Sequence, residues 1–425
     1  MHYFNLPKEF RLPILLFCFY CQSIVLAETQ QIHHLSLQQA EKIALMDDPL
    51  MNQFQYQSSR FEAQSIFAKT LPDPNLKLGI IGLPIDDFDR SKEAMTQLQI
   101  GLQQSFPAGK ILEKKSLKNR VMSTLQLQKK SHQTLLILKK VRQHYIEIYF
   151  HQKASQVISE SQKTFKQLVN ITEAHFASGK RNQQDVLRAE LELLKITDRS
   201  IKNKGRIDQA RVNLGKWIGD KALLSLQKSP PVLPRLHSSD KTLEALINHS
   251  VIIIEDQKIK AQDVAVDIAI EKFKPRWMLD VTYGERNSRN TNGSKRPELL
   301  SVMMNVSLPI HHHKKQGAWL SSEKSKLQAN RYQRIDKIRE LKRQFNLQLT
   351  LWESLKKRQY LFDQQMTQQA QLNVEAAMIA YQSSVSDFDT LIKSELIRLK
   401  IRLQAIKIKL ELTKSHAKLL YFQGE

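Results

Sequence analysis

The sequence predicts a mainly helical protein in which two amphipathic β-hairpins interrupt very long helices. Glycine and proline are absent between Gly109 and Gly179 and again between Gly317 and Gly424, and a stretch without helix breakers favours one long helix. Two other segments alternate apolar and polar residues, which is typical of strands. The same order of elements also occurs twice, so the chain is interpreted as a duplication.

The N-terminal segment 1–27 has the features of a secretory signal peptide. Lys8 and Arg11 precede an apolar run, and compact residues lead up to Ala27. This pattern predicts cleavage after Ala27. A membrane-spanning helix is the alternative, but the run is short and contains Pro13.

The remaining composition excludes several classes of protein. Both cysteines, Cys18 and Cys21, lie in the leader, so we expect neither a disulfide nor lipid attachment in the mature chain. The net charge is +23, but the basic residues are spread among Glu and Gln, which favours solvated helix faces over nucleic-acid binding. No catalytic motif is present, and we expect no enzymatic activity and no cofactor.

The first repeat is predicted to span residues 28–227. The order is a helix at 36–69, a hairpin at about 75–106, and helices at 111–176 and 182–226. In the hairpin, apolar residues occupy alternate positions, namely Leu76, Leu78, Ile80, Leu98, Ile100, Leu102 and Phe106. The polar residues between them would occupy the opposite face.

A proline-rich linker at 228–240 precedes the second repeat, predicted at 241–425. The expected order is a helix at 241–273, a hairpin at 276–308, and helices at 318–381 and 387–421. Apolar residues again alternate along its strands, namely Trp277, Leu279, Val281, Tyr283, Leu300, Val302, Met304, Val306 and Leu308.

The two hairpins have the pattern of membrane strands. Strands of about 9–11 residues with one apolar and one polar face suit a transmembrane β-barrel, with lipid outside and water inside. Four strands are too few to close a barrel, and an open edge is costly in lipid. The chain is therefore expected to oligomerise. The alternative is a soluble helical protein with two surface hairpins.

These residues and their duplicated order resemble the TolC family of outer-membrane efflux proteins over residues 35–420. The resemblance implies a homotrimer in which each chain gives four strands to a twelve-stranded barrel in outer-membrane lipid, continued by a helical tunnel in the periplasm. It also implies a passive exit duct that works with a periplasmic adaptor and an inner-membrane pump, most simply of the RND type. A periplasmic coiled-coil adaptor is the alternative function, although no lipoyl-like domain is seen.

Several short segments are similar to the heavy-metal branch of that family, which serves cobalt–zinc–cadmium or copper–silver efflux. They are LPDPNL at 71–76, GLP at 82–84, MTQLQIGLQQSFP at 95–107, RPE at 296–298 and SLPI at 307–310. This similarity implies heavy-metal cations as a possible cargo, but substrate does not follow from fold.

The resemblance also implies that two helix–helix turns form the periplasmic tip where an adaptor docks. The first turn consists of Ser178, Gly179, Lys180 and Arg181, and the second of Ser383, Ser384, Val385 and Ser386. Candidate gate residues follow these turns, namely Asp185, Arg188, Asp387, Asp389 and Lys393. The alternative role of the aspartates is favourable charge at a helix N-terminus. The basic residues among them argue against a purely acidic gate.

The run His311-His312-His313 is a weak metal candidate. In an extended segment, consecutive side chains point to opposite faces, so only His311 and His313 could share one ion. The nearest upstream carboxylate is Glu298. A polar junction between strand and helix is the alternative interpretation.

Overall fold

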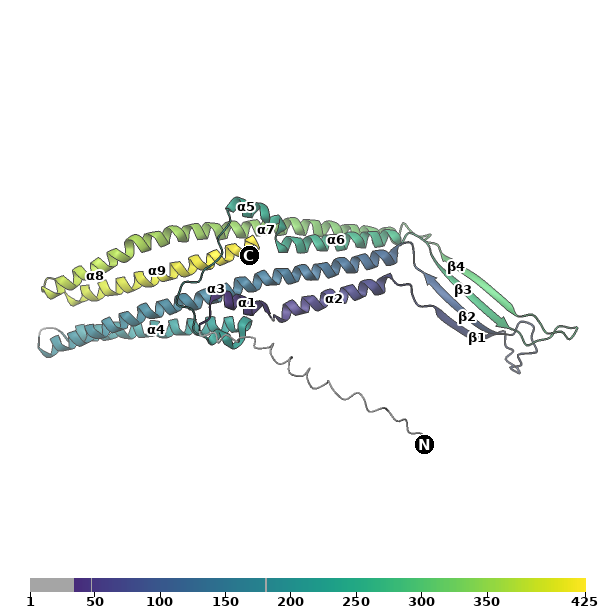
Figure 1. Cartoon of the computed structure of the whole chain (residues 1–425), viewed down its shortest axis with the longest axis horizontal. Coiled ribbons are helices and arrows are strands. Elements are labelled where there is room, and N and C mark those ends of the chain that lie inside the picture. Colours follow the sequence, from purple (N-terminus) through teal and green to yellow (C-terminus); the bar gives the residue numbers. More distant parts are fainter. Residues whose placement is uncertain (1–33, 47, 180–181) are drawn as a thin grey trace, which may run out of the picture.

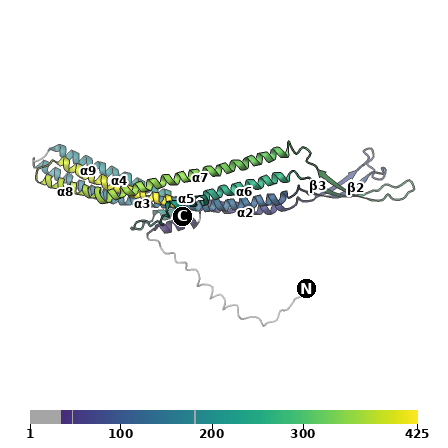
Figure 2. The same ribbon diagram turned by 90° about the horizontal axis from the view of Figure 1, so that it is seen from above.

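The computed structural model describes residues 34–46, 48–179 and 182–425. It is a long rod of helices with a four-stranded sheet at one end (Figure 1). The view turned by 90° shows the helices still running along the same axis, with the strands beyond them (Figure 2). The proposed signal peptide, Lys180 and Arg181 lie outside the described residues.

The elements follow the same order in both halves of the chain. The first half contains α1 (Leu37–Met46), α2 (Pro49–Lys69), β1 (Asn75–Ile81), β2 (Gln97–Phe106), α3 (Ile111–Ala177) and α4 (Gln183–Ile218). The second half contains α5 (Ser239–Ala245), α6 (Ser250–Glu271), β3 (Arg276–Glu285), β4 (Leu299–Ser307), α7 (Gln316–Leu361), α8 (Thr367–Gln382) and α9 (Phe388–Gln423). With 67 residues, α3 is about 100 Å long.

Two predicted helices are each broken in the structure. The helix predicted at 36–69 is α1 followed by α2, because Pro49 starts a new helix and Asp48 accepts a hydrogen bond from the Met51 N–H at 2.9 Å. The helix predicted at 241–273 is α5 and α6. His249 caps α6 after a short 3₁₀ turn, and its ring accepts from the Val251 N–H.

Two more helix boundaries differ from the predicted ones. The helix predicted at 182–226 ends at Ile218, because Gly219 adopts a φ of +60° that stops it, and a 3₁₀ turn follows. The long helix predicted at 318–381 contains a π-turn at Phe362–Met366, which separates α7 from α8. An insertion of this kind has no strong local sequence signal.

The helices are joined by apolar clusters that link the two repeats. One cluster packs Phe165 of α3 and Ile196 of α4 against Phe388 and Leu391 of α9. A second cluster, around Tyr145 of α3, holds α1 and α4. No helix in the described part of the chain is both long enough and apolar enough to cross a membrane.

The four strands form one antiparallel sheet in the order β1-β2-β3-β4, which confirms the two predicted hairpins. The hairpins are joined through β2 and β3, where Leu102 lies opposite Val281 and Ile100 opposite Tyr283. The register within each hairpin pairs Leu78 with Ile100 and Val281 with Val302. Apolar residues of all four strands therefore share one face.

Candidate functional site: sheet faces and helix tips

The sheet exposes its apolar face rather than covering it. Leu78 is 72% exposed and Val302 is 64% exposed, and other apolar residues of this face are similarly open. In the part of the chain that the structure describes, the helices continue from the ends of the strands and none lies over the sheet (Figure 1). In a water-soluble sheet this face would be covered by a core.

The opposite face of the sheet carries a polar network. The Lys77 ammonium donates to the Asp280 carboxylate, and so do the Gln103 amide at 3.3 Å and the Thr282 hydroxyl at 2.9 Å. Asp280 is only 5% exposed. The network therefore joins β1, β2 and β3 on the side away from the apolar residues.

The close approach of β2 and β3 in this network explains why position 101 is a glycine. A Cβ added to Gly101 would lie 2.5 Å from the Thr282 hydroxyl oxygen and 3.1 Å from the Val281 carbonyl oxygen. Only glycine fits between β2 and β3 without displacing that side chain.

Both outer edges of the sheet are open in the described chain. β1 pairs only with β2, and β4 pairs only with β3. Each edge leaves backbone N–H and C=O groups available for another strand. A second copy of the chain could continue the sheet by placing its β1 beside β4.

The two helix–helix turns lie together at the end of the rod opposite the sheet (Figure 1). In the turn between α3 and α4, Gly179 has a φ of +70°, and in the turn between α8 and α9, Ser384 has a φ of +59°. The second turn thus reproduces the left-handed conformation of the first without a glycine. Val385 beside it is 81% exposed.

The candidate gate residues have separate roles at these turns. Asp387 caps α9, since its carboxylate accepts from the Thr390 N–H at 2.9 Å and also from the Thr390 hydroxyl. These hydrogen bonds hold the pKa of Asp387 below its usual value. Asp185 is half-buried in the first turn of α4. Asp387 therefore sits at the helix N-terminus as the alternative interpretation expects, and its role in a gate stays a prediction.

Asp389 links the two repeats at the tip. It forms an ion pair with Arg188 of α4 and a second, at 2.5 Å, with Lys393 one turn further along α9. Tyr381 of α8 and His175 of α3 make a further contact between the repeats, with 3.2 Å between the hydroxyl and the ring nitrogen. The tip is thus held by mixed charges rather than by an acidic cluster.

The histidine run lies in a turn between β4 and α7, not in an extended segment as the metal argument assumed. His312 and His313 have ring centroids 4.1 Å apart, and all three residues are exposed. No group of three metal-ligating side chains occurs among the residues that the structure describes. Among the residues with a described position, His311 and His313 therefore belong to no such group.

Comparison with solved structures of outer-membrane channels confirms the predicted fold, with its sheet at one end and long helices beyond it. CusC, described in terms of transmembrane channel formation, matches with a TM-score of 0.74 at 15% identity, over 91% of both chains. VceC, an outer membrane protein of Vibrio cholerae, matches 91% of this chain and 96% of its own, with a TM-score of 0.76 at 14% identity.

The open state of the MtrE outer membrane channel of Neisseria gonorrhoeae also matches. Its TM-score is 0.71 at 16% identity, over 91% of this chain and 88% of that one. Identities this low establish a common fold, and function has to be argued from the site. No family model and no curated protein sequence matches this chain.

Proposed function

We propose that the chain is the outer-membrane channel subunit of a bacterial efflux system and provides a passive exit duct. The observation that carries this proposal is the inverted sheet, whose apolar face is exposed while Asp280 and its partners lie on the other face. Lipid would cover the first face and water would fill the space along the second. The fold shared with outer-membrane channels supports the same assignment.

Closure of the sheet requires copies of the chain, and a homotrimer supplies twelve strands. The open edges of β1 and β4 would pair between neighbouring protomers. Inside the bilayer the edge strands must pair, because each backbone N–H or C=O group left without a hydrogen bond there costs several kcal/mol. The helices that continue from the strands would extend the wall of the barrel into the periplasm.

The helix tips would then face the periplasm and receive an adaptor protein. The described candidates for that contact are Ser178, Gly179 and the turn 383–386, of which 383–385 are exposed. The pair between Arg188 and Asp389 ties α4 to α9 at the narrow end. Its loss would loosen the tip but leave the apolar cluster around Phe388 and Leu391 in place, so we propose that it contributes to opening of the tip.

The cargo is proposed from sequence resemblance, which favours heavy-metal cations delivered by an inner-membrane pump of the RND type. Such a duct needs no catalytic group of its own, because the pump would supply the energy. Deletion of the gene, followed by growth on a panel of metal salts and antibiotics, tests the cargo. Sensitivity confined to metals supports the metal assignment, and sensitivity confined to organic drugs contradicts it.

The location of the chain is tested by fractionation of cells that express it. The proposal predicts an oligomer in the outer-membrane fraction that requires detergent for extraction and has the mass of three chains. A monomer released from the periplasm without detergent would contradict the proposal. Purified oligomers placed in a planar bilayer should also conduct ions in discrete steps.

A further inference from the structure

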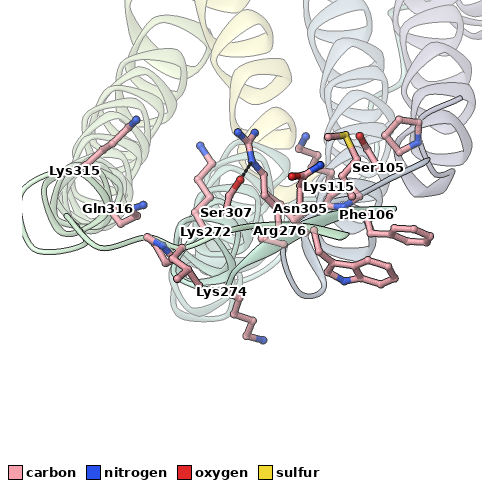
Figure 3. A pocket seen from close by; sticks show the side chains of 18 of the residues that line it. Ser105, Phe106, Lys115, Lys272, Lys274, Arg276, Asn305, Ser307, Lys315 and Gln316 are labelled. Carbon is pink, nitrogen blue, oxygen red and sulfur yellow. Dashed lines mark hydrogen bonds between the residues drawn. The ribbon is translucent and has the colours of Figure 1, made fainter. Parts of the chain in front are cut away.

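A cavity of about 890 Å³ lies where the strands join the helices. Figure 3 shows its walls, to which the ends of the strands contribute Ser105, Arg276, Asn305 and Ser307. These four positions alternate along the strands with apolar residues such as Phe106, so they lie on the polar face of the sheet. The strand wall of the cavity therefore belongs mainly to the face that the proposed duct turns to water.

The charged residues of the cavity are all basic. In the part of the chain that the structure describes, five cations and no carboxylate line it, and the cations are Lys115, Lys272, Lys274, Arg276 and Lys315. All five are exposed, so water reaches them. Ammonium and guanidinium groups gathered on one wall produce a positive potential, which attracts anions and repels cations.

The carboxylates around the cavity do not cancel this charge. Glu271, outside the lining, pairs with Lys274 at 2.8 Å, and Asp280 of the polar face pairs with Lys77. Glu113 is exposed in the first turn of α3, also outside the lining. Even when Glu271 and Glu113 are counted, five cations stand against two carboxylates. Among the described residues, the other four cations of the lining have no ion pair.

Two of these cations are held at the wall by neutral partners. The Lys272 ammonium nitrogen lies 4.4 Å from the ring centroid of Trp319 in α7. The Arg276 side chain donates from Nε to the Ser307 hydroxyl at 3.2 Å, as Figure 3 shows. Both contacts fix the position of the side chain and leave its charge in place.

We propose that these cations form a positive belt around the water-filled passage, and that the duct passes anions more readily than cations. The inference rests on the proposed function, since the three chains of the oligomer would repeat the cluster around one passage. In channels, rings of Lys and Arg side chains select anions, whereas rings of carboxylates select cations. The favoured cargo is therefore an anionic solute. A metal would cross the belt more readily as a complex with anionic ligands than as a bare cation.

The test is the reversal potential of the purified oligomer in a planar bilayer that separates two concentrations of potassium chloride. Near 0.1 M salt, the permeability to chloride should exceed that to potassium on the order of tenfold. The preference should weaken at 1 M salt, because the Debye length falls from about 10 Å to about 3 Å and the belt is screened.

Two variants test the cations themselves. Lys115→Gln/Lys272→Gln/Lys315→Gln removes three charges that have no ion pair, and it should bring the ratio of chloride to potassium permeability close to one. Lys115→Glu/Lys272→Glu/Lys315→Glu should reverse the preference, so that potassium passes more readily. Discrete conductance steps in each variant would show that it has folded and inserted.

The matched control is Lys221→Gln/Lys228→Gln/Lys241→Gln. It removes the same charge from exposed residues in and before α5, midway along the rod and away from the cavity (Figure 1), and it should keep the wild-type ratio. Wild-type channels without a preference for chloride, or a glutamine variant that keeps the preference, would overturn the inference alone. A wild type that forms no channel would contradict the proposed function, and the inference with it.

Discussion

A single charge placed on either face of β4 distinguishes a membrane strand from a surface hairpin. Val302 and Ser301 are neighbours in the middle of β4, and both are exposed in the isolated chain. Val302 lies on the apolar face, opposite Val281, and Ser301 lies on the polar face, opposite Thr282. The Val302→Lys substitution would place an ammonium group in lipid, whereas Ser301→Lys would place it in water.

The expected cost follows from depth in the bilayer. A lysine on the lipid face costs about 2–4 kcal/mol near the midplane of a barrel and much less near the interfaces. Three protomers would each carry this cost. Val302→Lys should therefore lower the free energy of unfolding of the vesicle-inserted protein. It should also lower the amount of protein in the outer membrane. Ser301→Lys should remain close to the wild type in both measurements.

The assay is urea titration of vesicle-inserted protein, followed by tryptophan fluorescence, together with immunoblots of outer-membrane fractions. Val302→Leu serves as the control that keeps the face apolar. Equal tolerance of lysine at both positions would refute the reasoning, since it is the result expected of a hairpin in water. A greater loss for Ser301→Lys would show that the two faces are assigned the wrong way round.

Four further predictions concern the helices. Arg188→Gln should increase channel conductance in a planar bilayer by breaking the pair with Asp389, whereas Lys393→Gln, which removes only the pair within α9, should leave the conductance near the wild-type value; an unchanged conductance in Arg188→Gln would exclude the pair as a closing contact. Asp387→Ala should lower the melting temperature through loss of the α9 cap, measured by thermal unfolding, whereas Asp387→Asn should lower it little. Ser384→Gly should raise stability by up to about 1 kcal/mol, because glycine adopts the observed positive φ without strain, and a lower melting temperature would contradict this. Burial lowers the pKa of His132 from 6.5 to about 4. As the pH falls from about 6.5 to about 4, the unfolded chain therefore takes up a proton at His132 before the folded chain does, and the folded state should lose about 2 kcal/mol of stability in that range. His132→Gln should reduce the slope of the melting temperature against pH there.

Local patterns in the sequence were sufficient for the strands and for the longest helices. Alternation identifies the apolar face of each hairpin, and the register that places Leu78 beside Ile100 follows from matching those faces. The breaks in the helices were harder to predict. Pro49 interrupts a helical pattern that otherwise continues on both sides, and the kink at His249 follows from packing against Tyr421, whose carbonyl oxygen lies 2.9 Å from the ring nitrogen.

The tip residues show where the sequence alone could not decide. Sequence left Asp387 open between a gate and favourable charge at a helix N-terminus. The hydrogen bonds with Thr390 show that Asp387 caps α9, and the gate stays a prediction. The pair between Arg188 and Asp389 joins residues from different repeats, so it depends on how α4 and α9 pack. For His311 and His313, the sequence argument assumed an extended segment, but the chain turns there before α7 begins.

The cavity where the strands join the helices, lined by Lys115, Lys272, Lys274, Arg276 and Lys315, had no local signal in the sequence. Lys115 lies in α3, whereas Lys272 and Lys274 follow the end of α6 and Lys315 precedes α7, and each one reads as an ordinary solvated residue in the sequence. They converge only because the ends of β2, β3 and β4 bring the helix termini together. The periodicity of the sequence therefore does not predict which residues meet at the boundary between the sheet and the helices.

The central claim is that copies of the chain close the sheet through its two open edges. Cysteine cross-linking in intact cells tests it most directly, with Leu78→Cys in β1 combined in turn with Leu300→Cys, Val302→Cys or Met304→Cys in β4. We predict covalent dimers and trimers on oxidation for at least one pair, and none for any of the single variants. If every double variant remains monomeric in the membrane fraction, the edges do not meet and the proposed barrel is wrong.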